Sequence, residues 1–219
     1  MSKNWEPSRP IPDLEDFCLE IGIGRIAKLY LRPELTPRQY FARLLVHNEP
    51  GDAVRFQSFS LPKRHAVWWA CLCLRSVVDP MRKPKQAEAL KAVVRWVLDP
   101  SEKHRQAAGK AGKVATFGTP IGAIAMSVFF SGGSIMPPDE KVIPPDPLLT
   151  ANILTGTIAG LIGEVPPEKA KPTLLTFIAL GISVALGKYP WKVEEGEEQN
   201  SAESRQPRHV AEQWVEFDT

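Results

Sequence analysis

The chain is poor in the residues that carry metal and redox chemistry. Its 219 residues include three cysteines and four histidines, with no Cys-x-x-Cys pair and no His-Glu-x-x-His pattern. The common zinc and thioredoxin-like motifs are therefore excluded. Cys71 and Cys73 are two positions apart, which on a helix points them to different faces. We expect buried thiols in a reducing compartment, and no metal or cofactor.

Strand patterns and phosphate-binding loops are missing as well. No segment shows sustained alternation of apolar and polar residues. The run from Gly181 to Lys188 superficially resembles a phosphate loop, but its spacing is one residue too long and its glycines lie in or at the end of an apolar helix. Nothing in the sequence supports catalysis, and we predict a protein that is not an enzyme.

Charged residues are absent from three stretches, 114–138, 147–163 and 172–187. Their lengths of 25, 17 and 16 residues approach the roughly 20 that a membrane span needs. Glycines and prolines interrupt the first stretch, and polar side chains are scattered through the other two. We therefore expect core helices. The N-terminus lacks the apolar stretch of a secretory signal, so a cytoplasmic location is expected.

The chain does contain a series of apolar helices separated by prolines, of which there are 21. The clearest helix begins at Pro62, and nine uncharged residues follow His65, including Trp68 and Trp69. A helix that is apolar on every side is buried on every side, so we expect this one to be the hub of the fold. Further helix starts are predicted at Thr36-Pro37, Asp52, Asp99-Pro100 and Thr119-Pro120.

These signals predict an all-α fold of about seven to eight helices, arranged as a single bundle or a short stack of helix hairpins. The helical domain is expected to span residues 13–188. Residues 1–12 are predicted to form a flexible arm, and residues 189–219 an acidic, disordered tail.

The net charge of +2 is unevenly distributed. Residues 53–113 hold 13 lysines and arginines against 4 acidic residues, whereas residues 190–219 hold 3 against 8. The basic segment suits either an anionic partner or ordinary solvated helix faces, and we favour the second. The acidic tail carries Trp214 and Phe217, a composition typical of a motif that docks in a partner's groove or folds back on its own domain.

Two further places are candidates for an interaction surface. Lys63 and Arg64 stand in the first turn of a helix, where positive charge opposes the helix dipole, so we expect a carboxylate partner from another helix or an external anion. His65 lies beside them. The Ser131–Ser134 run, Ser-Gly-Gly-Ser, is expected to end a helix with a left-handed glycine, and it is able to form a backbone nest for an anion or a peptide. The predicted interaction residues are Arg64, His65, Ser131, Gly132, Gly133, Ser134, Trp214 and Phe217.

Three motifs together resemble an uncharacterised family of bacterial all-helical proteins. They are Leu-Pro-x-Arg-x-Ala-Val-Trp-Trp-Ala-Cys at 61–71, Trp-Val-x-Asp-Pro-Ser-Glu at 96–102, and Ser-Gly-Gly-Ser at 131–134 followed by a proline-rich loop. The resemblance covers residues 35–187 and excludes the arm and the tail. Such proteins are loosely associated with type VI secretion gene clusters. The resemblance implies an accessory role, such as an adaptor or chaperone, and carries over no catalytic residue.

From this resemblance we expect a non-catalytic protein-interaction module of the bacterial cytoplasm, an adaptor or chaperone-like accessory of a secretion system. Its partner would be a protein, either a secretion component or an effector, and no nucleic acid is expected. Two alternatives stay open: a membrane-active protein that inserts its apolar C-terminal helices, and a nucleic-acid binder that uses residues 53–113 with steep salt dependence. Failure to bind liposomes and oligonucleotides at low salt would remove both.

Overall fold

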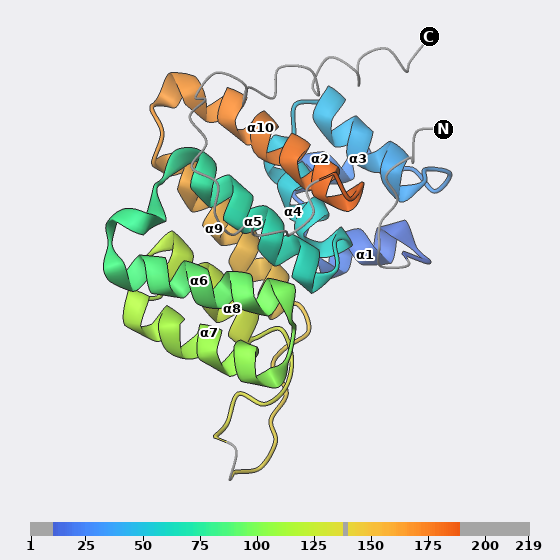
Figure 1. Ribbon diagram of the computed structural model, residues 1–219. Coiled ribbons are helices and arrows are strands. Elements are labelled where there is room, and N and C mark those ends of the chain that lie inside the picture. Colours follow the sequence, from blue (N-terminus) through green and yellow to red (C-terminus); the bar gives the residue numbers. More distant parts are fainter. Residues whose placement is uncertain (1–10, 138–139, 189–219) are drawn as a thin grey trace.

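The computed structural model describes residues 11–137 and 140–188 of the chain (Figure 1). In this part of the chain there are ten α-helices and one short 3-10 helix, and no strand. The all-α prediction is confirmed, with slightly more helices than expected. The predicted tail, with Trp214 and Phe217, and nearly all of the predicted arm lie outside the described residues. The helices are α1 (Leu14–Glu20), α2 (Arg25–Lys28), α3 (Pro37–Val46), α4 (Pro50–Ser60), α5 (Lys63–Val77), η1 (Pro80–Arg82), α6 (Pro84–Leu98), α7 (Glu102–Ala115), α8 (Pro120–Phe129), α9 (Leu149–Gly163) and α10 (Pro167–Ala185).

Helix α5 is largely buried, as its composition predicts, but it shares the centre of the fold with α8 and α9, each of which also packs against four helices. It packs against α6, α8, α9 and α10, and it lies in the middle of the molecule (Figure 1). Val67, Trp69, Ala70 and Cys73 are fully buried on it. Because neighbours cover it on several sides, α5 loses more apolar surface to the core than a peripheral helix would.

Helix α10 is fixed to α4 and α5 by two side chains that donate to its backbone. The indole Nε1 of Trp69 donates to the carbonyl oxygen of Phe177 at 2.7 Å, and the amide Nε2 of Gln57 donates to that of Ile178 at 3.2 Å. Gly181 permits this close approach, since a Cβ there would lie 2.5 Å from the side-chain Cδ of Gln57. The polar atoms of two buried side chains therefore set the position of α10.

Helix α4 begins earlier than predicted. The expected cap was Asp52, but the helix begins at Pro50 and its N-cap residue is Glu49. Proline is preorganised for the first helical position, which places Asp52 inside the first turn. The Asp52 carboxylate instead accepts a hydrogen bond of 2.8 Å from the backbone N–H of Gly24, which joins the N-terminal helices to α4.

Helix α7 also begins at a different residue from the one predicted. Its N-cap residue is Ser101, so Asp99 lies outside the helix. Asp99 precedes a proline and has an extended backbone, as residues before proline usually do. Its carboxylate lies 3.1 Å from Nδ1 of His104. Glu102 thus becomes the first residue of α7, and its carboxylate is available for another contact.

The three charge-free stretches supply core helices. No helix in the described ranges is long and apolar enough to cross a membrane. Ile124 of α8, Leu154 and Ile158 of α9 and Phe177 of α10 are fully buried in the shared core.

We predict that Trp69→Phe lowers the free energy of unfolding by about 1–3 kcal/mol, because it leaves a cavity and removes the donor to the Phe177 carbonyl. Urea denaturation followed by circular dichroism measures the change. Leu98→Ala, at an exposed apolar position, is the control and should change stability by less than about 0.5 kcal/mol. Equal effects of the two substitutions would contradict the role assigned to Trp69.

Candidate interaction surface

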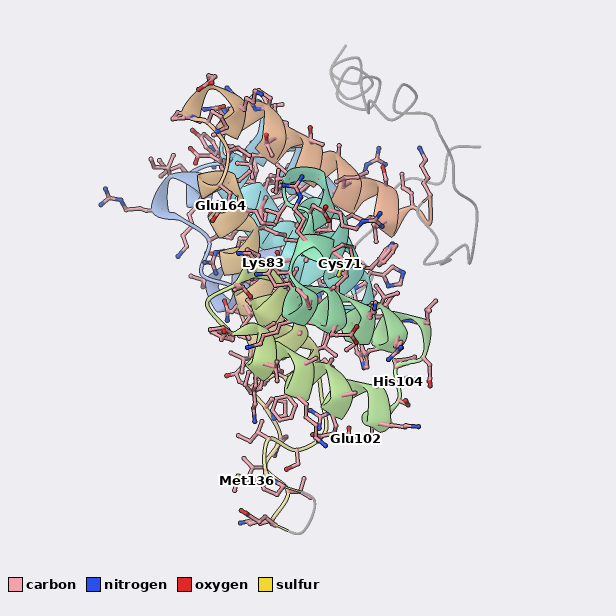
Figure 2. All side chains as sticks on the ribbon, turned by 60° about the vertical axis from the view of Figure 1, so that its left-hand side comes forward. Cys71, Lys83, Glu102, His104, Met136 and Glu164 are labelled. Carbon is pink, nitrogen blue, oxygen red and sulfur yellow. The ribbon has the colours of Figure 1, made fainter. Side chains whose placement is uncertain are left out.

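The connection between α8 and α9, residues 131–148, extends away from the helical body (Figure 1). We call it the α8–α9 loop. Figure 2 shows Met136 near its far end, well beyond the helices. Three apolar side chains of the loop are exposed to solvent, at 39% for Ile135, 69% for Val142 and 41% for Ile143. Exposed apolar residues on a projecting loop are typical of a surface that meets another molecule.

The two arms of the loop are joined at its base. The backbone N–H of Ile135 donates to the carbonyl oxygen of Ile143 at 2.9 Å. The hydroxyl oxygen of Ser134 accepts from the backbone N–H groups of Met136 and Ile143, at 3.0 and 3.2 Å. The base of the loop is therefore ordered by hydrogen bonds although its side chains face solvent.

Arg105 anchors this base to the helical body. Its side chain is only 3% exposed. The guanidinium donates from Nε and Nη2 to the two carboxylate oxygens of Glu102, each at 2.6 Å. It also donates from Nη1 to the carbonyl oxygen of Phe129, and from Nη2 to the carbonyl oxygen of Ser134 at 3.1 Å. It also lies over the ring of Phe129, 4.9 Å from its centre. The planar guanidinium thus joins α7, the end of α8 and the loop.

Gly133 makes room for the guanidinium. Its φ is +64°, in the left-handed region that glycine adopts without strain. A Cβ on Gly133 would lie 2.6 Å from Nη2 of Arg105 and 2.8 Å from a carboxylate oxygen of Glu102. Gly133 is left-handed, but it does not cap α8 as we predicted, because the C-cap residue of that helix is Phe130. Both the conformation of Gly133 and its neighbours disfavour a larger residue.

The Ser131–Ser134 run differs from the predicted anion nest. The ammonium group of Lys63 donates to the carbonyl oxygen of Ser131 at 2.9 Å, and Arg105 donates to that of Ser134. An anion nest points backbone N–H groups at a ligand, whereas this run presents carbonyl oxygens to two cations. Burial lowers the pKa of Lys63, and the nearby charge of Asp146 partly opposes that effect.

Arg64 and His65 follow Lys63 directly, at the start of α5. The guanidinium of Arg64 donates to the carbonyl oxygens of Val97 and Leu98, at 2.6 and 2.9 Å. These partners are carbonyls at the end of α6, which carry partial negative charge. His65 is half-buried, and burial followed by the charge of Arg64 lowers its pKa.

The loop base is where three segments that are distant in sequence come together. Lys63 and Arg64 come from the first motif of the resemblance, Glu102 from the second, and Ser131–Ser134 is the third. Glu102 lies at the end of α7 nearest the loop (Figure 2). Sequence reasoning missed Arg105, the residue that connects them. The available signal was its position three residues after Glu102, a spacing that brings two helical side chains together.

Nucleophilic chemistry has little support among the described residues. All three cysteines are buried, and burial raises the pKa of Cys18 and of Cys71 to about 12. A thiol with such a pKa stays protonated at neutral pH and is unreactive. Within the described ranges, no group of three or more His, Cys, Asp or Glu residues is placed to hold a metal ion.

We predict that Arg105→Met lowers the free energy of unfolding by about 2 kcal/mol, because the carbonyls of Phe129 and Ser134 lose their charged donor. Amide hydrogen exchange at Ile135 and Ile143 should become faster in the same variant, since both report on the loop base. Lys103→Met, at an exposed position on the same helix, should change stability by less than about 0.5 kcal/mol. Unchanged exchange in Arg105→Met would show that the loop base is ordered without the anchor.

The stability of the fold should depend on pH through the carboxyl group of Glu102. The hydrogen bond that it accepts from Arg105 holds the pKa of its carboxyl below the ordinary value of 4.5. A lowered pKa stabilises the fold above the unfolded-state pKa, and that contribution is lost as the pH falls through the folded-state value. The stability difference between wild type and Glu102→Gln should therefore be constant near neutral pH and shrink below pH 4.5. A difference that grows on acidification would contradict the pairing.

Comparison with known proteins agrees with an uncharacterised helical family. Residues 40–185 match the model of a family described as of unknown function, DUF6931. The match covers two thirds of the chain and takes in most of α3, all of α4 to α10 and the whole α8–α9 loop. No curated protein and no solved structure matches significantly. The chain therefore belongs to the DUF6931 family, whose function is unknown.

Proposed function

We propose that this protein is a non-catalytic interaction module that meets a protein partner through the α8–α9 loop. The proposal rests on one observation: the loop exposes apolar side chains to solvent, while hydrogen bonds hold its base in place. Ile135, Val142 and Ile143 face solvent, while Lys63 and Arg105 hold the base through backbone carbonyls. Apolar groups on an ordered base bind with a smaller entropy cost than the same groups on a mobile chain.

The cellular role proposed for this module is that of an adaptor or chaperone-like accessory of a bacterial secretion system, acting in the cytoplasm. Its support is the resemblance of the three motifs to helical proteins associated with type VI secretion gene clusters. Glu102 and the Ser131–Ser134 run at the loop base belong to two of these motifs, whereas Lys63 stands at the unspecified position of the other and Arg105 lies outside all three. A role in secretion would thus involve the surface that the geometry favours.

A pull-down from the protein's own host tests both parts of the proposal. Three tagged forms are compared by mass spectrometry: the wild type, the loop variant Ile135→Ser/Val142→Ser/Ile143→Ser, and a control with the same kind of change at Leu29, Val46 and Val114. The control positions are exposed apolar residues outside the loop. We expect one protein to co-purify with the wild type and the control, and to be reduced about tenfold or more with the loop variant.

Two results would contradict the proposal in different ways. Equal recovery of the partner with the loop variant, or no specific partner at all, would contradict an interaction through the loop. Recovery of a loop-dependent partner with no connection to secretion would leave the interaction module standing and remove the secretion role.

A further inference from the structure

The second arm of the α8–α9 loop is stiffened by its covalent structure. Residues 141–147 read Lys-Val-Ile-Pro-Pro-Asp-Pro. Proline fixes its own φ near −65°, and it restricts the preceding residue to extended or polyproline II conformations. Together these two effects constrain every position from Ile143 to Pro147. In agreement, residues 141–146 run without a turn or bend.

Hydrogen bonds hold this segment at both ends. At one end, the backbone N–H of Ile143 donates to the hydroxyl of Ser134, and its carbonyl accepts from Ile135. At the other end, the carboxylate of Asp146 accepts from the N–H of Leu148 at 2.7 Å, and its carbonyl accepts from the N–H of Leu149 at 3.1 Å. The segment is therefore presented in one conformation before any partner arrives.

A lysine and two prolines recur in this segment at the period of a polyproline II helix, although every residue from Glu140 to Pro147 except Pro145 is exposed. That helix has three residues per turn, so positions 141, 144 and 147 lie along one ridge. Lys141, Pro144 and Pro147 are all exposed, whereas Pro145, on the neighbouring ridge, is half-buried. The solvent-facing ridge thus carries a cation at one end and two proline rings.

We propose that Lys141, Pro144 and Pro147 form a docking ridge for a protein domain that binds polyproline II helices in an aromatic-lined groove, of the SH3 type. Proline rings separated by two residues fit between aromatic side chains in such grooves, and the preformed helix lowers the entropy cost of binding. Lys141 calls for an acidic side chain at one end of the groove. This inference rests on the proposed function, because it names the kind of partner that the loop meets.

The test compares prolines of the same loop on different ridges. Pro144→Ala and Pro147→Ala each remove an exposed ring, whereas Pro145→Ala removes a ring of equal size at a half-buried position. All three substitutions relax the chain to a similar extent. The full-length proteins are titrated with the SH3-fold domains of the host, purified one at a time, and with the partner from the pull-down.

We expect at least one SH3-fold domain to bind the wild type. Pro144→Ala and Pro147→Ala should each weaken that binding about tenfold, because each removes one hot-spot contact. Lys141→Ala should weaken it less at high salt than at low salt, because salt screens the charge of the lysine. Pro145→Ala should leave the affinity within about twofold of the wild type.

Other outcomes contradict the inference, and they show separately whether the proposed function also fails. If no SH3-fold domain binds and the pull-down partner tolerates Pro144→Ala, the ridge is not the docking element, although the loop remains an interaction site. If Pro145→Ala weakens binding as much as Pro144→Ala, the prolines act only by stiffening the loop. If the partner also tolerates the triple loop variant, the proposed function itself has failed.

Discussion

One guanidinium group, that of Arg105, joins three parts of the chain that the sequence keeps apart. It pairs with Glu102 on its own helix, donates to the Phe129 carbonyl at the end of α8, and donates to the Ser134 carbonyl of the loop. Arginine does not lose its charge at any working pH, so its guanidinium remains a charged donor throughout. Without a donor at this place, the buried carbonyls would lack partners and the projecting loop would lack a fixed base.

Polar groups also fix the positions of helices in the core. Apolar burial brings the helices together around α5, but single polar groups decide where each neighbour lies. Trp69 and Gln57 fix α10 through its backbone carbonyls, Asp52 fixes the N-terminal helices through Gly24, and Arg64 caps α6. Apolar contacts are non-directional, whereas hydrogen bonds have defined geometry. A rigid helical body is the consequence, and it is the platform from which the loop extends.

The helical class and the burial of α5 were predictable because uncharged runs and proline breaks are local signals. Two helix starts were less predictable. Asp52 and Asp99 have the composition of caps, yet the carboxylate of Asp52 binds the distant Gly24 amide, and that of Asp99 lies beside His104, five residues further along the chain. Arg64 was expected to meet a carboxylate or an external anion, and the sequence does not show that the end of α6 offers it two carbonyls. Arg105 was missed because a buried arginine on a polar helix has the same neighbours in sequence as an exposed one.

We infer that the segment after Glu140 is held in one conformation that favours recognition. Backbone ¹⁵N relaxation of the wild-type protein tests it directly, at the amides of Lys141, Val142, Ile143 and Asp146. The account predicts order parameters close to the roughly 0.85 of rigid backbone, at a level similar to that of α8 and α9. Values below about 0.6 at these four amides would show a mobile loop and contradict the account.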